Sequence, residues 1–481
     1  MSRIYLTTTI PYVNAAPHLG FALEAVQADT LARHHRHIGA EVRLLTGTDD
    51  NSLKNVLSAE AAGLPVQEFV DRNAAKFRAL QGPLGLAYDD FIATSRDPRH
   101  EPGVHALWRA CKDDLYRARY EGLYCVGCEH FLTDTDRCPE HDVPPQQVAE
   151  ENWFFRLSRY TDPLREAITS GRLRIEPQAR RNEVLALLDQ GLRDFSVSRS
   201  SERAKGWGIA VPGDPDQVIY VWFDALGNYI TSLGYGGDES ALATWWHGAD
   251  RRVHLIGKGV LRFHAVYWPA ILLSAGLPLP TDILVHDYLT VDGRKISKST
   301  GTPIDPVALA ERYGTDALRC WLLREVPRVG DADFTLARLI ARSNEDLAGG
   351  IGNLVSRITN LVHRYRYGRV KSSTVDSLAA GAESAVDAAL SDFDFRRATA
   401  AVWSVVEQAN RYLEQERPWE LARSSSDRLD HVLAVLVDAC LSLGSLLEPF
   451  LPDAAARVIE QCTPVDGVLP PPVRLFPRIE S

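Results

Sequence analysis

The sequence predicts an α/β fold, in which a doubly wound parallel-sheet domain carries an inserted segment and is followed by a helical bundle. Three observations predict it. Short β-prone runs alternate with helical patterns up to about residue 335, a cluster of cysteines interrupts this alternation, and alanine- and leucine-rich helical patterns fill the rest of the chain. The 481 residues are too many for one core. We therefore expect a split domain at 1–115 and 206–336, an insertion at 116–205 and a helical domain at 337–481.

The first elements form a βαβ unit. A β-prone run at 4–7 precedes a helical pattern at about 19–36, and an apolar run at 42–45 then leads into Thr46-Gly47-Thr48-Asp49. Such a unit predicts a parallel, Rossmann-like sheet whose ligands bind at the carboxyl ends of the strands. Two further β-like runs, at 218–223 and 253–256, each precede a helical pattern.

Composition restricts the class of protein. Hydrophobic residues make up 45% of the chain and charged residues 24%, which is ordinary for a globular protein. The net charge of -10 argues against a protein that binds polyanions nonspecifically over its surface, but it does not exclude a local patch that binds nucleic acid. Neither a signal peptide nor an apolar run long enough to span a bilayer stands out, so we expect no membrane partner. Four of the seven cysteines are scattered through apolar surroundings, which favours a reduced, cytoplasmic protein, and a monomer is the default expectation.

The cysteine cluster has the spacing of a structural zinc site. Cys125 and Cys128 are separated by two residues, and so are Cys138 and His141. Each pair can chelate a tetrahedral Zn²⁺ from one turn, and four protein ligands leave no open position for catalysis. The alternative is a set of unrelated thiols beside a surface histidine.

Two segments carry residues suited to phosphate groups. His18 lies where the first strand gives way to a helix, where the helix N-terminus favours anionic oxygens and a histidine can donate a hydrogen bond. Lys295 and Lys298, in a loop with glycine and serine, can close on a triphosphate and stabilise departing pyrophosphate. Each segment taken alone has an alternative interpretation. His18 is then a structural histidine at the start of a helix, and the segment with Lys295 and Lys298 is a basic surface loop.

Together these segments resemble the two signatures of class I aminoacyl-tRNA synthetases. The similarity to the methionyl-tRNA synthetase family is closer still, and its motifs follow that family's order along the chain. These motifs are Ile10–Asn14, Thr46–Asp49, the cysteine cluster, Asn152–Leu157, Tyr220–Leu226, Arg262–His264 and Tyr313–Ala317.

The resemblance implies a two-step reaction. ATP with Mg²⁺ would activate methionine as the aminoacyl-adenylate, and the acyl group would then pass to the 3′ end of tRNA. His18, Lys295 and Lys298 would be catalytic, and Asp49 would hold the substrate ammonium. The other expected amino-acid contacts are Ile10, Tyr12, Trp222, Ala225, Leu226, Tyr229, Val260 and His264. The expected ATP contacts are His18, Gly20, Phe21, Gly257, Gly259, Lys295, Ser297 and Lys298; those of the anticodon are Asn353, Arg357 and Trp419.

Three departures from the family pattern lie near the ATP motifs. Phe21 occupies the place of the signature's second histidine, Asp50-Asn51-Ser52 replaces Glu-His-Gly, and Gly259 replaces an aspartate. They leave two alternatives open. One is a paralogue that activates an amino acid and joins it to a small molecule other than tRNA, such as an N-hydroxylated amine. The other is a catalytically weak tRNA-binding or regulatory protein.

Overall fold

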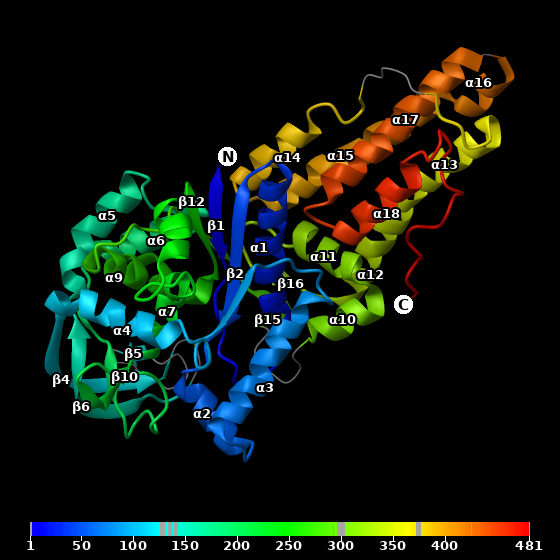
Figure 1. Ribbon diagram of the computed structural model, residues 1–481. Helices are drawn as coiled ribbons and strands as arrows, with labels where there is room; N and C mark the ends of the chain where they lie inside the picture. Colours follow the sequence, from blue (N-terminus) through cyan, green and yellow to red (C-terminus); the bar gives the residue numbers. More distant parts are fainter. Residues whose placement is uncertain are drawn as a thin grey trace. The chain divides into compact units, whose positions relative to one another are not determined.

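The computed structural model describes residues 2–125, 130–132, 137–138, 143–291, 293–295, 304–371, 377–424 and 426–480. The chain forms two compact units (Figure 1). The first unit comprises Met1–Pro17, Gly39–Ala79 and Tyr88–His286, and the second comprises His18–Ile38, Leu80–Ala87 and Asp287–Ser481.

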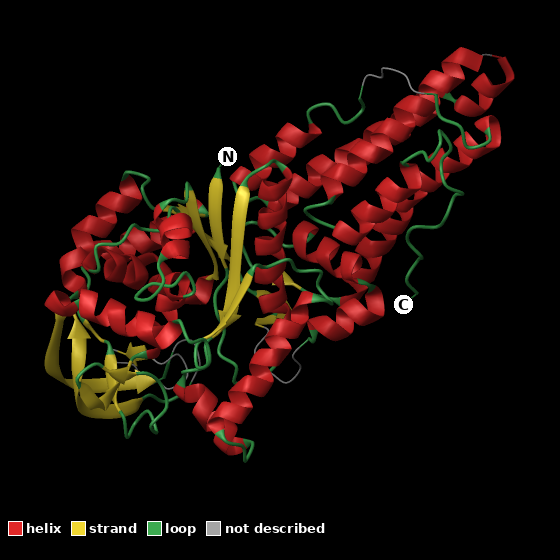
Figure 2. Cartoon of the chain, in the orientation of Figure 1, coloured by secondary structure: helices red, strands yellow, loops and turns green. Residues whose placement is uncertain are grey.

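A six-stranded sheet forms the centre of the first unit, and every neighbouring pair of its strands is parallel (Figure 2). The chain order reverses at the middle of the sheet, between β1 and β12. This confirms the predicted doubly wound class. In such sheets ligands bind at the carboxyl ends of the two strands where the order reverses. In sheet order the strands are β3 (Asp90–Ala93), β2 (Glu41–Thr48), β1 (Arg3–Thr7), β12 (Arg251–Gly257), β13 (Asp282–His286) and β7 (Arg174–Glu176).

Burial explains why these short runs form strands. Four of the five residues of β1 are buried, and the last five residues of β2 are buried without alternation, which is typical of a parallel sheet covered on both faces. Gly47 permits the close approach of β3, because a Cβ atom there would lie 2.2 Å from the Ile92 carbonyl oxygen. Any larger residue would push β2 and β3 apart.

Helices and smaller sheets complete the first unit. An antiparallel sheet of order β5-β4-β6-β8 and another of order β10-β11-β9 lie in and beside the range predicted as an insertion. These strands are β4 (Leu115–Cys125), β5 (His130–Leu132), β6 (Gln146–Phe155), β8 (Phe195–Ser196), β9 (Ser198–Ser200), β10 (Ala210–Val211) and β11 (Asp214–Ile219). The helices are α2 (Leu53–Ala61), α3 (Val66–Arg78), α4 (His100–Ala110), α5 (Thr161–Thr169), α6 (Gln178–Asp189), α7 (Val221–Thr231), α8 (Ser240–Leu242) and α9 (Trp268–Ser274).

Two details differ from expectation. The run at 218–223 is the end of β11 followed by the first turn of α7 rather than one strand, because a short apolar run fits a buried helix as well as a strand. Within the range predicted as an insertion, β7 pairs with β13 at the edge of the main sheet. Its three residues are too few for a recognisable periodicity.

The second unit is mainly helical. Its helices are α1 (Leu19–His37), α10 (Pro306–Tyr313), α11 (Thr315–Arg324), α12 (Leu336–Arg342), α13 (Asn353–Arg366), α14 (Ala382–Ser391), α15 (Phe395–Glu416), α16 (Pro418–Ser424), α17 (Ser426–Leu447) and α18 (Pro452–Cys462). A small sheet of order β15-β14-β16 joins them, with strands β14 (Leu289–Val291), β15 (Arg294–Lys295) and β16 (Ala332–Asp333). This arrangement confirms the predicted helical region, and α17 packs against α15, α16 and α18 (Figure 1).

A buried ion pair connects the separate segments of the second unit. Arg319 of α11 is fully buried, and its Nη2 lies 2.8 Å from Asp29 Oδ2 of α1. The same guanidinium donates to the carbonyl oxygens of Leu84 and Phe450, at 3.0 and 2.7 Å. The second Asp29 oxygen accepts a hydrogen bond from the Ala87 N–H at 2.7 Å, so both charges are well coordinated.

One helix corrects the expectation that no apolar run could span a bilayer. Asp427–Leu447, within α17, is long and apolar enough by length and composition alone. Its apolar window is 67% buried inside the protein, as is usual for the central helix of a bundle.

Candidate functional site

The candidate site lies at the carboxyl ends of the central strands of the first unit. Ile10 and Tyr12 follow β1, Asp49 follows β2, and Val260 and His264 follow β12. Because the carboxyl ends of parallel strands lie on the same side of a sheet, residues that follow different strands lie close together there. All nine residues expected to contact the amino acid belong to this unit.

Asp49 is a buried carboxylate held by its backbone. It forms an isolated parallel bridge with Tyr12, and its N–H donates to the Pro11 carbonyl oxygen at 2.9 Å. The Asn55 side chain donates to the Asp49 carbonyl oxygen, also at 2.9 Å. Only 2% of Asp49 is exposed, which suits a carboxylate that pairs with a buried cation.

Four of the expected residues line one face of α7. Trp222, Ala225, Leu226 and Tyr229 are spaced at i, i+3, i+4 and i+7, the repeat of a single helical face. Trp222 stacks on Phe263 with ring centroids 3.7 Å apart, and the centroid of the Tyr12 ring lies 6.4 Å from that of Trp222. The indole Nε1 of Trp222 is buried and has no hydrogen-bond partner among the described residues.

Hydrogen bonds define the proton positions on His264. Its Nδ1 lies 2.9 Å from the Val260 carbonyl oxygen, which can only accept, so Nδ1 carries the proton. In the neutral ring Nε2 is then an acceptor, and the Tyr229 hydroxyl, 2.7 Å away, donates to it. The Tyr229 oxygen keeps lone pairs but has no further proton to offer.

The surroundings favour a neutral His254 ring. His254 contacts the Tyr229 ring in a stacked arrangement at 4.2 Å, and burial lowers the pKa of His254 well below its usual value. The Trp268 Nε1 donates to His254 Nε2 at 3.1 Å, so the His254 proton lies on Nδ1, next to the Thr7 hydroxyl. A buried carboxylate together with a wall of polarizable rings suits an amino acid with a flexible apolar side chain.

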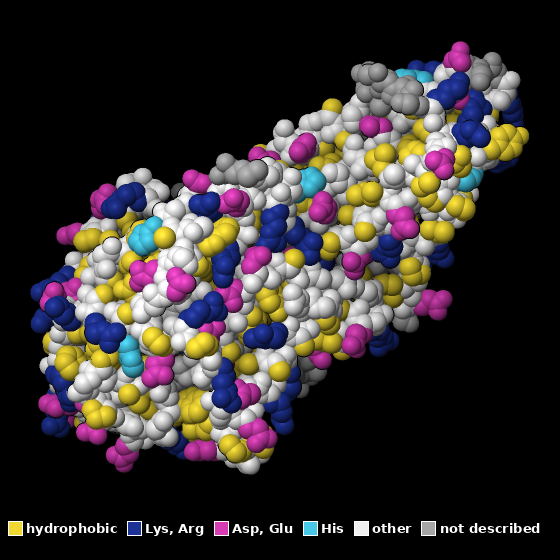
Figure 3. All heavy atoms as spheres, viewed as in Figure 1, with side chains coloured by type: hydrophobic (Ala, Val, Ile, Leu, Met, Phe, Trp, Pro, Cys, Tyr) yellow, Lys and Arg dark blue, Asp and Glu magenta, His cyan; other side chains and the backbone are white. Residues whose placement is uncertain are grey.

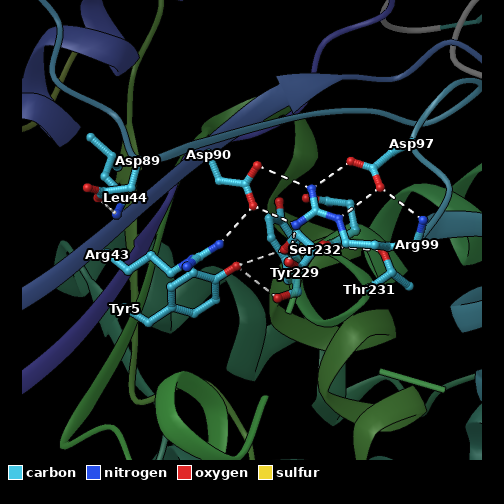
Figure 4. Close-up of polar contacts among 11 residues, drawn as sticks. Tyr5, Arg43, Leu44, Asp89, Asp90, Asp97, Arg99, Tyr229, Thr231 and Ser232 are labelled. Atoms are coloured by element: carbon cyan, nitrogen blue, oxygen red, sulfur yellow. Dashed lines mark hydrogen bonds and ion pairs between the residues drawn. The ribbon is translucent and has the colours of Figure 1, made fainter. Parts of the chain in front are cut away.

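A polar network fixes the carboxyl-terminal end of α7 (Figure 4). The Tyr5 hydroxyl of β1 donates to the Tyr229 carbonyl oxygen at 2.9 Å, and Arg99 donates to the Ser232 carbonyl oxygen at 2.7 Å. Asp90 of β3 contacts Arg99 at 2.9 Å. The last turn of α7 is thereby tied to the sheet, which holds its aromatic face in place.

Asp50 is a second buried carboxylate beside Asp49. Its Oδ2 accepts hydrogen bonds from the Ser95 hydroxyl at 2.9 Å and from the Ser95 N–H at 3.3 Å. Burial nevertheless raises the pKa of Asp50 to about 6, because desolvation outweighs these hydrogen bonds.

A cavity beside this loop contains residues that the sequence reasoning missed. The Arg199 guanidinium lies over the Tyr220 ring at 4.1 Å and over the Tyr124 ring at 5.2 Å. Arg199 stands alone among serines in the sequence, so no spacing or periodicity identifies it. The cavity is lined by Asn51, Leu53, Tyr124, Arg199, Arg203, Ala204, Trp207 and Val218–Val221.

The expected ATP residues are distributed over both units. In the second unit, His18 caps α1, and its Nδ1 accepts a hydrogen bond from the Gly20 N–H at 3.1 Å, which leaves the ring proton on Nε2. Phe21 lies in the first turn of the same helix. In the first unit, Gly257 ends β12 and Gly259 lies in the turn that follows. Lys295 ends β15, whereas Ser297 and Lys298 lie outside the described residues.

The cysteine cluster is only partly described. Cys125 ends β4 and pairs with His130 of β5, and Cys138 donates its N–H to the Val143 carbonyl oxygen at 2.9 Å. Both side chains are buried. Cys128 and His141 lie outside the described residues, and the described part alone contains no group of three metal-binding side chains.

The expected anticodon residues lie in the second unit. Asn353 begins α13 and is exposed, and Trp419 lies in α16, which packs near α13. Arg357 contacts Glu414 of α15 at 2.7 Å. Figure 3 shows Lys and Arg side chains gathered at the end of this unit that carries α16, a local basic surface on an acidic protein.

Comparisons with known proteins cover almost the whole chain. Residues 4–147 and 137–359 match the family described as tRNA synthetases class I (M), and residues 366–474 match the anticodon binding domain of methionyl tRNA ligase. The methionine–tRNA ligase of Thermotoga maritima is 39% identical over 478 residues, covering 95% of this chain and 75% of that protein. That of Brucella suis is 38% identical over 477 residues, covering 95% and 91%. The structure of Mycobacterium tuberculosis methionyl-tRNA synthetase in complex with methionyl-adenylate superposes with a TM-score of 0.91 at 36% identity, covering 99% of this chain and 100% of that one.

Proposed function

The chain belongs to the methionyl family of class I tRNA synthetases, and from that membership we propose that it activates methionine with ATP and transfers it to tRNA. The observation that carries this proposal is the face of α7. There a hydrogen-bonded Tyr229–His264 pair and the Trp222 ring lie at the strand ends together with the buried Asp49.

The first step forms the aminoacyl-adenylate. The methionine carboxylate attacks the α-phosphate of ATP, a new C–O–P linkage forms, and pyrophosphate leaves. Asp49 binds the substrate ammonium and α7 contacts the thioether, so the carboxylate is oriented without a covalent enzyme intermediate. His18, whose Nε2 carries the proton, is suited to donate to phosphate oxygens at the α1 N-terminus. Mg²⁺, when bound with ATP, neutralises phosphate charge.

Lys295 and Lys298 support the same step as cations near the leaving pyrophosphate, and Gly20, Gly257 and Gly259 are expected backbone contacts for ATP. In the second step a ribose hydroxyl of the tRNA 3′ end attacks the activated carbonyl carbon and AMP leaves. Asn353, Arg357 and Trp419 are the proposed anticodon contacts, since amide, guanidinium and indole groups suit unpaired bases.

A structural zinc ion fits the cysteine cluster. Cys125 and Cys138 offer two buried thiols of the kind that Zn²⁺ prefers, and Cys128 and His141 would complete the set. The ion would stabilise the segment that carries these four residues and would take no part in the reaction. We also propose that the protein is a cytoplasmic monomer.

The two alternative functions are not favoured. A ligase with a small acceptor has no need of an anticodon domain, yet residues 366–474 match one. A binding protein without activity has no need of an aromatic thioether pocket beside a buried carboxylate.

Amino-acid-dependent ATP–pyrophosphate exchange, run with each of the twenty amino acids, tests the first step. Acylation of total tRNA with any active amino acid tests the second. Methionine-dependent exchange with tRNA charging is expected. Exchange without charging, or with a different amino acid, would contradict the proposal and point to another acceptor or substrate.

A further inference from the structure

A chain of buried hydrogen bonds connects both ends of α7 to α4. Asp224, in the first turn of α7, is 1% exposed, and its Oδ1 accepts a hydrogen bond from His100 Nε2 at 2.5 Å. The other ring nitrogen, Nδ1, lies 2.8 Å from the hydroxyl of Thr231, the last residue of α7. His100 is fully buried at the start of α4, so one ring bridges the two ends of the helix.

Asn51 extends this chain to the loop after β2. Its side-chain Nδ2 donates to the second Asp224 oxygen at 2.7 Å, and its backbone N–H donates to Asp49 Oδ1 at 3.2 Å. Asn51 therefore contacts two carboxylates at once. One is the group proposed to hold the substrate ammonium, and the other belongs to the helix that carries the aromatic wall.

We propose that Asn51 is a positioning residue for amino-acid binding, which ties the Asp49 carboxylate to α7 through Asp224. This inference rests on the function proposed above. The site is proposed to bind the substrate ammonium at Asp49 and the substrate side chain at the face of α7. Both groups can bind at once only if the distance between Asp49 and that face is fixed. His100 serves the same arrangement indirectly, because it leaves Asp224 no freedom to turn away.

The charge of the side chain explains why an amide suits this position. An acidic residue would face Asp224 and repel it at hydrogen-bond distance. A cationic residue would pair with the carboxylates and compete with the substrate ammonium. A neutral N–H donor satisfies Asp224 and leaves the negative charge of Asp49 available.

Asn51 can be replaced without disturbing the core. It is only partly buried and lines the cavity beside Trp207 and Tyr220. Variants at this position are thus expected to fold, unlike substitutions of the fully buried His100 or Asp224.

The test compares Asn51→Ala with Asn51→Asp in methionine-dependent ATP–pyrophosphate exchange at pH 8. Loss of a hydrogen bond to a charged group predicts a rise of about tenfold in the KM for methionine in Asn51→Ala. Asn51→Asp is expected to raise this KM further, whereas the KM for ATP changes little in both variants. A role in packing alone would give the opposite order, because aspartate has nearly the volume of asparagine and alanine does not.

Asn344→Ala is the matched control. Asn344 is also partly buried and also makes two hydrogen bonds, to the Ile479 carbonyl oxygen and N–H at 2.9 and 2.8 Å, but it lies in the second unit. The KM of the Asn344→Ala variant for methionine is expected to equal that of the unmodified protein. Two results would overturn the inference alone, provided that the unmodified protein shows methionine-dependent exchange. One is an unchanged KM for methionine in both Asn51 variants. The other is a KM for methionine that rises more in Asn51→Ala than in Asn51→Asp. No methionine-dependent exchange by the unmodified protein would overturn the proposed function and the inference with it.

Discussion

Replacing Asp50 by asparagine is expected to stabilise the protein in a pH-dependent way. Burial raises the pKa of this carboxyl from 3.8 to about 6, so the folded state holds its proton more tightly than the unfolded state does. A difference of about two pH units corresponds to about 3 kcal/mol. This is the free energy by which the ionised Asp50 destabilises the folded chain at neutral pH.

The sign follows from proton binding in the two states. Below pH 3.8 the carboxyl is protonated in both states and causes no destabilisation. Between pH 3.8 and about 6 unfolding releases the proton, so stability falls as the pH rises. Above about pH 6 the full destabilisation is present. Asparagine has the same shape, keeps an oxygen for the Ser95 hydrogen bonds and does not ionise.

Urea denaturation of both proteins across the range from about pH 4 to about pH 8 measures the effect as a shift of the transition midpoint. The variant is expected to match the unmodified protein at the acid end and to exceed it by up to about 3 kcal/mol near neutral pH. Asp71→Asn is the control. The Arg96 hydrogen bond lowers the pKa of Asp71, so that variant should lose a little stability near neutral pH. A gain from Asp50→Asn that is equal at both ends of the range, or a loss throughout, would refute the reasoning.

Three other substitutions test separate parts of the structure. Tyr229→Phe removes the donor to His264 and should raise the KM for methionine about fivefold to tenfold in pyrophosphate exchange, and an unchanged KM would contradict the assigned hydrogen bond. Arg319→Met removes one of the two guanidinium groups that lie 2.8 Å from the buried Asp29, the other being that of Arg33, and it also removes the donors to the Leu84 and Phe450 carbonyl oxygens. It should lower stability by about 2–3 kcal/mol in thermal unfolding, whereas a loss below about 1 kcal/mol would show that these contacts matter little. Cys125→Ser should abolish stoichiometric zinc measured by atomic absorption on the purified protein, and undiminished zinc would place the ion elsewhere.

The fold class was predictable because periodicity survives in long elements. The βαβ pattern and the alanine-rich helices are each long enough to distinguish a repeat of two from a repeat of 3.6. The strand β7 has three residues, and the run at 218–223 spans a strand end and a helix start, so neither carries a distinct period.

The candidate site was predictable only in part. The spacing of Trp222, Ala225, Leu226 and Tyr229 is helical, but it identifies one face only once α7 is known to begin at Val221. Arg199 has no sequence neighbour that marks it, and its position over Tyr220 depends on the pairing of β9 with β11. Side-chain pairing of this kind is a property of the tertiary structure, which a single sequence does not display.

The ion pair between Arg319 and Asp29 has a consequence for the order in which the chain can fold during its synthesis. The second unit takes its α1 segment from the start of the chain and most of its helices from the end, with Leu80–Ala87 between them. During synthesis α1 leaves the ribosome long before Arg319 exists, so this unit can close only after the first unit has been translated. A fragment beginning at residue 287 would contain the buried arginine without its aspartate or the Leu84 carbonyl. The helical unit is therefore expected to fold independently only when the 18–38 and 80–87 segments are supplied with it.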